Sequence, residues 1–158
     1  GSTYVLGAVG LDQAVQTFRK QTDPSGSPLG VEPKLLLVPP ELEFTANQLY
    51  QSELFNTGGS ATTAKVPTKN TFAGKYEPLV SAYLSNSSYT GYSAAAWYLL
   101  ADPQDMATIQ VGFLNGVQEP TVETADADFD QLGIQMRGYF DFGVALMQTR
   151  GGVKVTGA

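Results

Sequence analysis

The chain has 158 residues, enough for one domain that buries a hydrophobic core without disulfides or metals. It contains no cysteine and no histidine, which excludes disulfides, thiolate chemistry, metal sites built on those residues and histidine acid–base catalysis. The net charge of -6 argues against sequence-specific nucleic-acid binding, because phosphate contacts require a positive surface. We also expect no membrane contact, because no apolar run approaches the ~20 residues of a membrane-spanning helix and the sequence does not open with a signal peptide.

The first predicted element is an amphipathic helix that ends before Pro24. Its apolar residues recur at helical spacing, at Leu11, Val15 and Phe18. Prolines and glycines are frequent in residues 23–33, which predicts an irregular connector after this helix.

A short apolar run, Leu35 to Val38, is the centre of the predicted fold. It lies between Pro33 and Pro39, and neither proline can donate a hydrogen bond to a neighbouring strand. An uninterrupted apolar run of this length predicts a strand that is buried on both faces. An amphipathic helix over residues 40–50 should follow, because apolar residues recur at helical spacing and proline suits the first position of a helix.

The middle of the chain predicts a loop followed by short strands. Residues 56–74 show no periodicity and contain glycine, serine, threonine and proline, which favours a flexible loop. Strands are expected in the segments 76–84, 94–101 and 106–114. Asn115-Gly116, a favoured pair for a two-residue hairpin turn, follows the last of these segments.

The clearest β pattern lies near the end of the chain. From Leu132 to Phe142 every second residue is apolar or glycine. This alternation predicts one long strand, with a bend or bulge at Gly138. A further short strand is expected at 153–155. Taken together, the helices and strands predict an α+β fold with a mainly antiparallel sheet.

Residues 119–130 carry acidic residues and no basic ones. The aspartates from Asp126 to Asp130 have the opening spacing of a calcium loop, but Gln131 and Arg137 stand where such a loop requires glycine and glutamate. We therefore expect a solvated acidic loop, the alternative being weak divalent-cation binding between subunits. No combination of carboxylates, serine and lysine suggests catalysis, so we expect neither an enzyme nor a cofactor.

Tyrosine is concentrated between Tyr76 and Tyr98, together with the only tryptophan, Trp97. Trp97 lies in an apolar segment and is expected in the core. Tyr89 and Tyr92 lie in a polar turn and are better explained as contact residues, because tyrosine is enriched at protein interfaces.

Two stretches resemble the major capsid proteins of tailed phages, in particular the Mu-type major head subunit. The first runs from Asp23 to Glu43 and contains Pro-Lys-Leu-Leu-Leu-Val-Pro-Pro-Glu-Leu-Glu; the second is the Trp-Tyr-Leu strand between Ala96 and Ala101. The resemblance covers roughly residues 10–150 in the family's order. It implies the HK97-like coat-protein fold and places this chain in the C-terminal half of such a protein, without its N-terminal arm, extended hairpin loop and spine helix.

The same resemblance implies a single α+β unit over 1–158, with an axial-type lobe at about 10–105 and a peripheral-type β-layer at about 106–158. It also implies a structural function in the virion. The full-length protein would assemble in the bacterial cytoplasm into the hexamers and pentamers of an icosahedral shell around packaged phage or prophage DNA. This piece by itself is expected to be able to remain monomeric.

We expect contacts between subunits in the 56–74 loop and in the tyrosine-rich turn, at Asn56, Gly58, Gly59, Lys65, Lys69, Tyr89 and Tyr92. The alternative function is a β-rich binding module of a phage-tail or cell-surface protein. In that case the tyrosine-rich turn would recognise a carbohydrate or a receptor.

Overall fold

The computed structural model describes residues 4–57, 66–126 and 133–157. These residues fall into two compact units. The first, called the body here, consists of Gly1–Thr108 together with Gln148–Ala158. The second, called the ribbon unit, is Ile109–Met147. The ribbon unit is therefore an insertion in the chain of the body.

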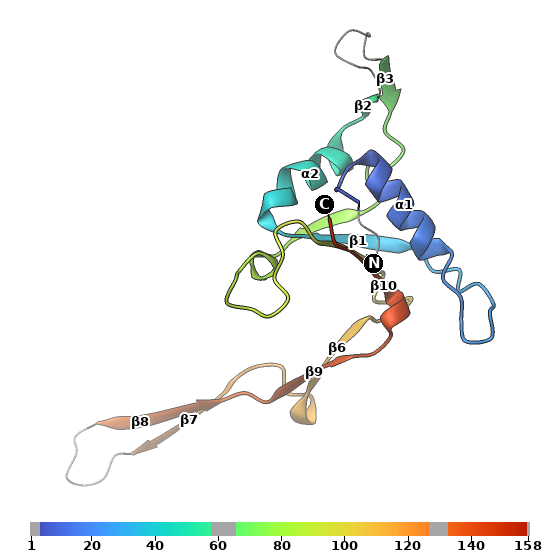
Figure 1. The fold of residues 1–158 in the computed structure, drawn as a ribbon. Helices are drawn as coiled ribbons and strands as arrows, with labels where there is room; N and C mark the ends of the chain where they lie inside the picture. Colours follow the sequence, from blue (N-terminus) through green and yellow to red (C-terminus); the bar gives the residue numbers. More distant parts are fainter. Residues whose placement is uncertain (1–3, 58–65, 127–132, 158) are drawn as a thin grey trace. The chain divides into compact units, whose positions relative to one another are not determined.

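The body is built on a four-stranded sheet with the strand order β10-β5-β1-β4 (Figure 1). Its strands are β1 (Pro33–Val38), β4 (Glu77–Val80), β5 (Trp97–Ala101) and β10 (Gly152–Val155). β1 pairs in parallel with β4, whereas the β1–β5 and β5–β10 pairs are antiparallel. The α+β class is thus confirmed, with mixed pairing in this sheet.

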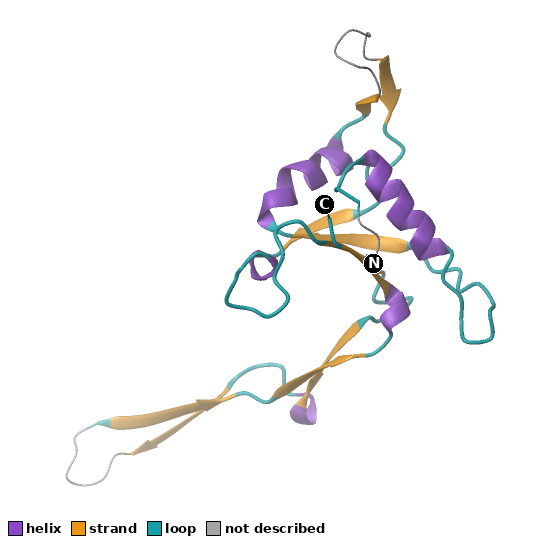
Figure 2. Cartoon of the chain, viewed as in Figure 1, coloured by secondary structure: helices purple, strands orange, loops and turns teal. Residues whose placement is uncertain are grey.

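Two helices lie on one face of the sheet, as Figure 2 shows. They are α1 (Ala8–Arg19) and α2 (Glu43–Gln51), and the short 3-10 turn η1 (Pro40–Leu42) precedes α2. Both were expected from the helical spacing of their apolar residues. Further 3-10 turns are η2 (Ala82–Leu84) and η4 (Thr149–Gly151). The predicted strand at 76–84 therefore ends at Val80.

The core of the body forms between these helices and the sheet. It consists of apolar residues from α1 and α2 and of alternate residues from β1, β5 and β10. Trp97 is fully buried, as expected, and its indole Nε1 donates a hydrogen bond to the carbonyl oxygen of Tyr4 at 3.2 Å. The prediction that the first strand is buried on both faces was wrong. Leu36 and Val38 are buried, but Leu35 and Leu37 are only half-buried, because both helices cover the same face.

The expected flexible loop at 56–74 contains regular structure. β2 (Leu54–Thr57) and β3 (Val66–Lys69) pair in antiparallel fashion, with Asn56 opposite Pro67 and Leu54 opposite Lys69. The loop prediction was wrong for these described residues, since β-branched and apolar residues alternate too briefly there to give a clear signal. The residues from 58 to 65 lie outside the described part of the chain.

A buried amide side chain holds the segment that follows β3 against the end of α2. Asn70 is the buried polar residue of the described chain, and its Nδ2 donates to the carbonyl oxygens of Leu49 and Ser52, both at 2.7 Å. Its Oδ1 accepts a hydrogen bond from the backbone N–H of Phe72 at 2.8 Å. The Asn70 side chain thus satisfies carbonyl groups that the end of α2 leaves without helical partners.

The ribbon unit is a nested pair of antiparallel ladders. Its strands are β6 (Ile109–Phe113), β7 (Thr121–Asp126), β8 (Ile134–Tyr139) and β9 (Phe142–Leu146), and the 3-10 turn η3 (Leu114–Gly116) follows β6. β6 pairs with β9, and β7 pairs with β8. The prediction of one long strand from Leu132 to Phe142 was wrong, because the chain leaves β8 after Tyr139 and begins β9 at Phe142. Gly138 pairs regularly with Val122 and forms no bulge.

Asn115-Gly116 forms the expected tight turn but not the expected hairpin. Both residues have positive φ, 53° and 73°, and the backbone N–H of Val117 donates to the carbonyl oxygen of Leu114 at 3.2 Å. Asparagine and glycine are the residues that adopt this conformation most readily. The turn redirects the chain into β7, while the partner of β6 is β9.

Candidate functional site

The β6–β9 ladder carries a face made only of large apolar side chains. Its cross-strand pairs are Ile109 with Leu146, Val111 with Val144, and Phe113 with Phe142. Side chains of directly paired residues lie on the same face of a sheet. Phe113 is half-buried and the other members are exposed; Val144, for example, is 61% exposed and Leu146 64% exposed. An apolar face of this kind is typical of a surface that packs against another protein.

The opposite face of the same ladder is nearly flat. It presents Gln110 opposite Ala145 and Gly112 opposite Gly143. These residues offer little apolar surface. An extensive apolar contact of this ladder must therefore use the face of Val111 and Val144.

The two faces of the β7–β8 ladder differ in polarity, and the less polar face still includes Thr124. On one face Arg137 forms an ion pair with Glu123, to which its Nε donates a hydrogen bond at 2.7 Å, and the Tyr139 hydroxyl contacts the same carboxylate at 3.3 Å. On the other face Val122, Met136 and Ile134 are exposed. The expected solvated acidic loop was therefore wrong about the secondary structure of Thr121–Asp126, which form a strand, exposed at residues 122–125, whose Glu123 pairs with Arg137 of the partner strand. Residues 127–130 of the expected loop, with the aspartates of the calcium-like spacing after Asp126, lie outside the described part of the chain.

The second face of the body's sheet is a further exposed apolar surface. The strand register places Leu37 beside both Leu79 and Tyr98 on this face. Leu79 is 52% exposed, and the Lys154 ammonium lies 5.8 Å from the centre of the Tyr98 ring. This face carries charge at its margin, unlike the face of β6–β9.

The tyrosine-rich turn lies in the body, and its predicted contact residues are accessible. Tyr89 and Tyr92 are each about half exposed. The Tyr89 ring packs edge-on against Tyr83 with centroids 5.5 Å apart, which restricts its orientation.

The remaining predicted interface residues are placed as follows. Asn56 lies in β2, and Lys69 is exposed at the end of β3, where it is paired with Leu54. Gly58, Gly59 and Lys65 lie outside the described residues. The assignment of these positions to a subunit interface stays a prediction.

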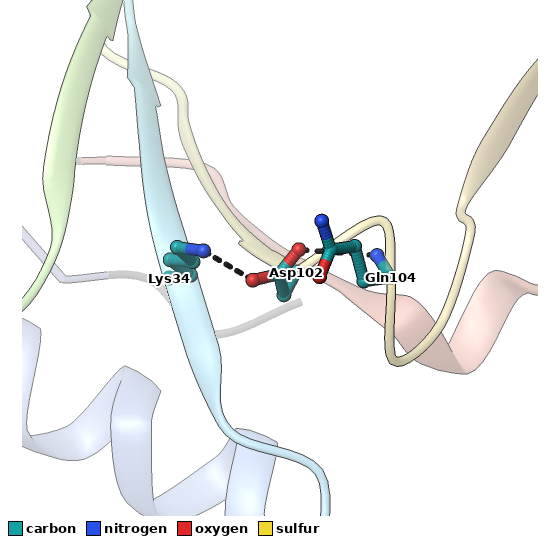
Figure 3. Close-up of polar contacts among 3 residues, drawn as sticks. All are labelled: Lys34, Asp102 and Gln104. Carbon is teal, nitrogen blue, oxygen red and sulfur yellow. Dashed lines mark hydrogen bonds and ion pairs between the residues drawn. The ribbon is translucent and has the colours of Figure 1, made fainter.

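An ion pair fixes the edge of the body where β5 ends (Figure 3). Lys34 forms it with Asp102 across the β1–β5 pair, at a point where the register shifts between Pro33 and Leu35. The Lys34 ammonium lowers the pKa of the Asp102 carboxyl, helped by the backbone N–H of Gln104, which donates to Asp102 at 3.0 Å. The hydrogen bond that the Lys34 ammonium donates to Asp102, together with the negative charge of that carboxylate, raises the pKa of Lys34.

Within the described ranges, no group of three or more acidic, cysteine or histidine residues is arranged to hold a metal ion. No helix in this part of the chain is long and apolar enough to cross a membrane. The exposed apolar faces and the tyrosine-rich turn are the candidate functional features that the described residues present.

Comparison with known protein families identifies the family of this chain. The model of a protein family described as phage capsid protein matches residues 1–155, so that the body and the ribbon unit both fall within it. No curated protein and no solved structure matches the chain.

Proposed function

Because this chain belongs to the phage capsid protein family, we propose that it is part of a major capsid protein with the HK97-like fold, similar to the Mu-type major head subunit. The family match over residues 1–155 carries this proposal. The family is one of structural proteins, so the chain serves in the phage capsid in contact with other subunits. The binding-module alternative gains no support from this match.

The exposed ribbon unit supports a role in assembly. A two-stranded ladder standing alone in water is at best marginally stable, and it needs further strands or a packing partner. Both ladders of the ribbon unit keep an exposed apolar face. A protein that works in contact with copies of itself has partners available to cover such faces, whereas a monomeric enzyme has none.

The finer parts of the proposal concern how the shell is built. The subunits form hexamers and pentamers of an icosahedral shell around packaged DNA. In each subunit the segment of about 10–105 forms an axial-type lobe and that of about 106–158 a peripheral-type β-layer. Contacts at Asn56, Lys69, Tyr89 and Tyr92, and at the undescribed Gly58, Gly59 and Lys65, join neighbouring subunits. The net charge of -6 suits a shell whose DNA is neutralised by counterions.

Electron microscopy of the complete gene product tests this function. The protein is expressed with any flanking sequence that its gene supplies, purified and examined by negative staining over a range of salt and pH. We expect closed, uniform shells or rings with five- and six-fold symmetry. A monodisperse monomer under every condition would overturn the proposal.

A matched pair of variants tests the tyrosine-rich turn. Tyr92→Ser removes an exposed ring, and Tyr4→Ser removes another exposed ring of the body that was not predicted as a contact. We expect the first variant to lower the yield of shells and the second to leave it unchanged. Equal yields from both variants would remove Tyr92 from the interface.

A further inference from the structure

We propose that the apolar face of the β6–β9 ladder is a self-complementary contact, which packs against the same face of a second copy of this chain. The face consists of Ile109, Val111, Phe113, Phe142, Val144 and Leu146. The proposal rests on the proposed function, since it supposes that copies of the chain meet during assembly. It adds which surface meets which, and with what symmetry.

The composition of the face indicates an apolar partner. None of its positions carries a charge or a hydrogen-bonding side chain. A partner with charged groups would lose their hydration against this face without gaining compensating contacts. The face of the β7–β8 ladder that carries Val122 also includes Thr124 and, by register, the position of Asp126 opposite Ile134, and the second face of the body's sheet has Lys154 at its margin. Among the described surfaces, the one whose apolar chemistry best matches the β6–β9 face is therefore the same face on a second copy.

The order of residues along the face indicates a two-fold arrangement. Val111 and Val144 form the central pair, and a pair of larger apolar residues lies on each side of it. When a second copy faces the first across a two-fold axis that passes beside the Val111–Val144 pair, large side chains therefore lie against large side chains. A two-fold contact of this kind joins the same patch on both subunits. The result is a two-layer packing of four strands, with the layers ~10 Å apart.

The size of the face fits one contact among several. Its side chains, mostly about half to two thirds exposed, together present on the order of 500 Å² of apolar surface per copy, given about 150–250 Å² for a whole aromatic side chain. This is less than the ~800 Å² per partner of a stable standard interface. The contact is therefore weak between isolated chains and becomes strong when a shell holds the copies together.

Single-cysteine crosslinking tests the arrangement directly, because the chain has no cysteine of its own. The 158-residue protein is prepared as Val144→Cys, with the label on the apolar face, and as Gln110→Cys, with the label on the opposite face of the same ladder. Each variant is treated with a short bismaleimide whose span matches the ~10 Å spacing of packed sheets. The product is measured as covalent dimer on a denaturing gel.

We expect Val144→Cys to give at least about five times more covalent dimer than Gln110→Cys at equal concentration, because a two-fold axis through the central pair brings the two labels together. Equal yields would overturn the proposal. Mixing Val144→Cys with Leu79→Cys tests the other apolar surface. A mixed dimer, without Val144→Cys dimers, would show that the ladder packs against the body's sheet, and would also overturn it.

A second pair of variants separates this inference from the proposed function. In the complete gene product, Val144→Lys should reduce the yield of shells about tenfold or more, whereas Gln110→Lys should not. The fluorescence of the buried Trp97, the only tryptophan, should show in both variants that the body is folded. Normal shells from Val144→Lys would overturn the inference and leave the function intact. Absence of shells from the unaltered protein would overturn the function, while the crosslinking result still decides the contact.

Discussion

The body and the ribbon unit both contain strands with an apolar face, but this face is buried in the body and exposed in the ribbon unit. In the body, alternate residues of β1, β5 and β10 are buried under α1 and α2. In the ribbon unit, alternate residues of β6 and β9 form an equally apolar face that stays exposed. The strands are alike, and the two units differ in whether helices pack on the apolar face. A strand's alternation creates a face to be buried, and the partner that buries it can come from the same chain or from another.

The largest expected effect compares two leucines of equal size in strands. Leu99 of β5 is 0% exposed, whereas Leu146 of β9 is 64% exposed. Leu99→Ala should lower the free energy of unfolding of the isolated chain by about 2–5 kcal/mol, because it removes buried methyl groups and leaves a cavity. Leu146→Ala should change it by less than about 1 kcal/mol.

Urea unfolding followed by Trp97 fluorescence measures both values. If Leu146→Ala cost as much as Leu99→Ala in the isolated chain, the ribbon unit would already be covered there. In assembled shells the difference between the effects of Leu99→Ala and Leu146→Ala on stability should become smaller, since Leu146 is then buried by the second copy.

A smaller effect is expected from the polar group inside the body. Asn70→Ala removes the side-chain amide that forms hydrogen bonds with backbone groups of Leu49, Ser52 and Phe72. It should lower the free energy of unfolding by about 1–3 kcal/mol, because these buried backbone groups lose their partners. The matched change Asn86→Ala, in an exposed turn where Asn86 accepts from Ser88, should cost about 0.5 kcal/mol or less. Equal unfolding midpoints for the two variants would show that Asn70 does not hold the return from β3.

The smallest effect is the pH dependence of the Lys34–Asp102 ion pair. The folded-state pKa of Asp102 lies below its usual value, so the unfolded chain binds more protons in the acidic range. The stability that Asp102 adds is present above its unfolded pKa of about 3.9, and it is lost as the pH falls through the folded value.

The pKa of Lys34 is raised, so its contribution is present below the unfolded pKa of about 10.4 and is lost as the pH rises through the folded value. Unfolding midpoints of the unaltered chain and of Asp102→Asn should therefore differ slightly at neutral pH and converge in acid. A difference that stays constant down to acidic pH would contradict this account. The ribbon unit should be insensitive to the change, because Lys34 and Asp102 both lie in the body.

The parts of the fold that could be predicted from sequence are those where a local pattern is long enough. The helical spacing of Leu11, Val15 and Phe18 predicted α1, and the apolar run after Pro33 predicted β1. A strand was also expected in the segment 106–114, where the structure has β6, with Ile109, Val111 and Phe113 on one face.

Other features could not be predicted because local patterns do not identify partners. β2 and β3 are too short for their periodicity to stand out. β7 was missed because its acidic residues dominated the interpretation, although Thr121, Val122 and Thr124 are typical of strands. The alternation of apolar residues also could not predict that the face of β6 and β9 stays exposed, because the sequence pattern is the same whether or not another element packs on that face.

The insertion of the ribbon unit between β5 and β10 also has a consequence for the order of folding. β5 and β10 are neighbours in the sheet, although residues 102–151 separate them in the chain. Closing a flexible loop costs conformational entropy that grows by about 0.6 kcal/mol with each doubling of its length. Once β6 has paired with β9, the free length of this loop falls to roughly a quarter, which lowers the cost by about 1 kcal/mol. Pairing of β6 with β9 before β10 joins the sheet therefore lowers the entropic cost of bringing β10 beside β5.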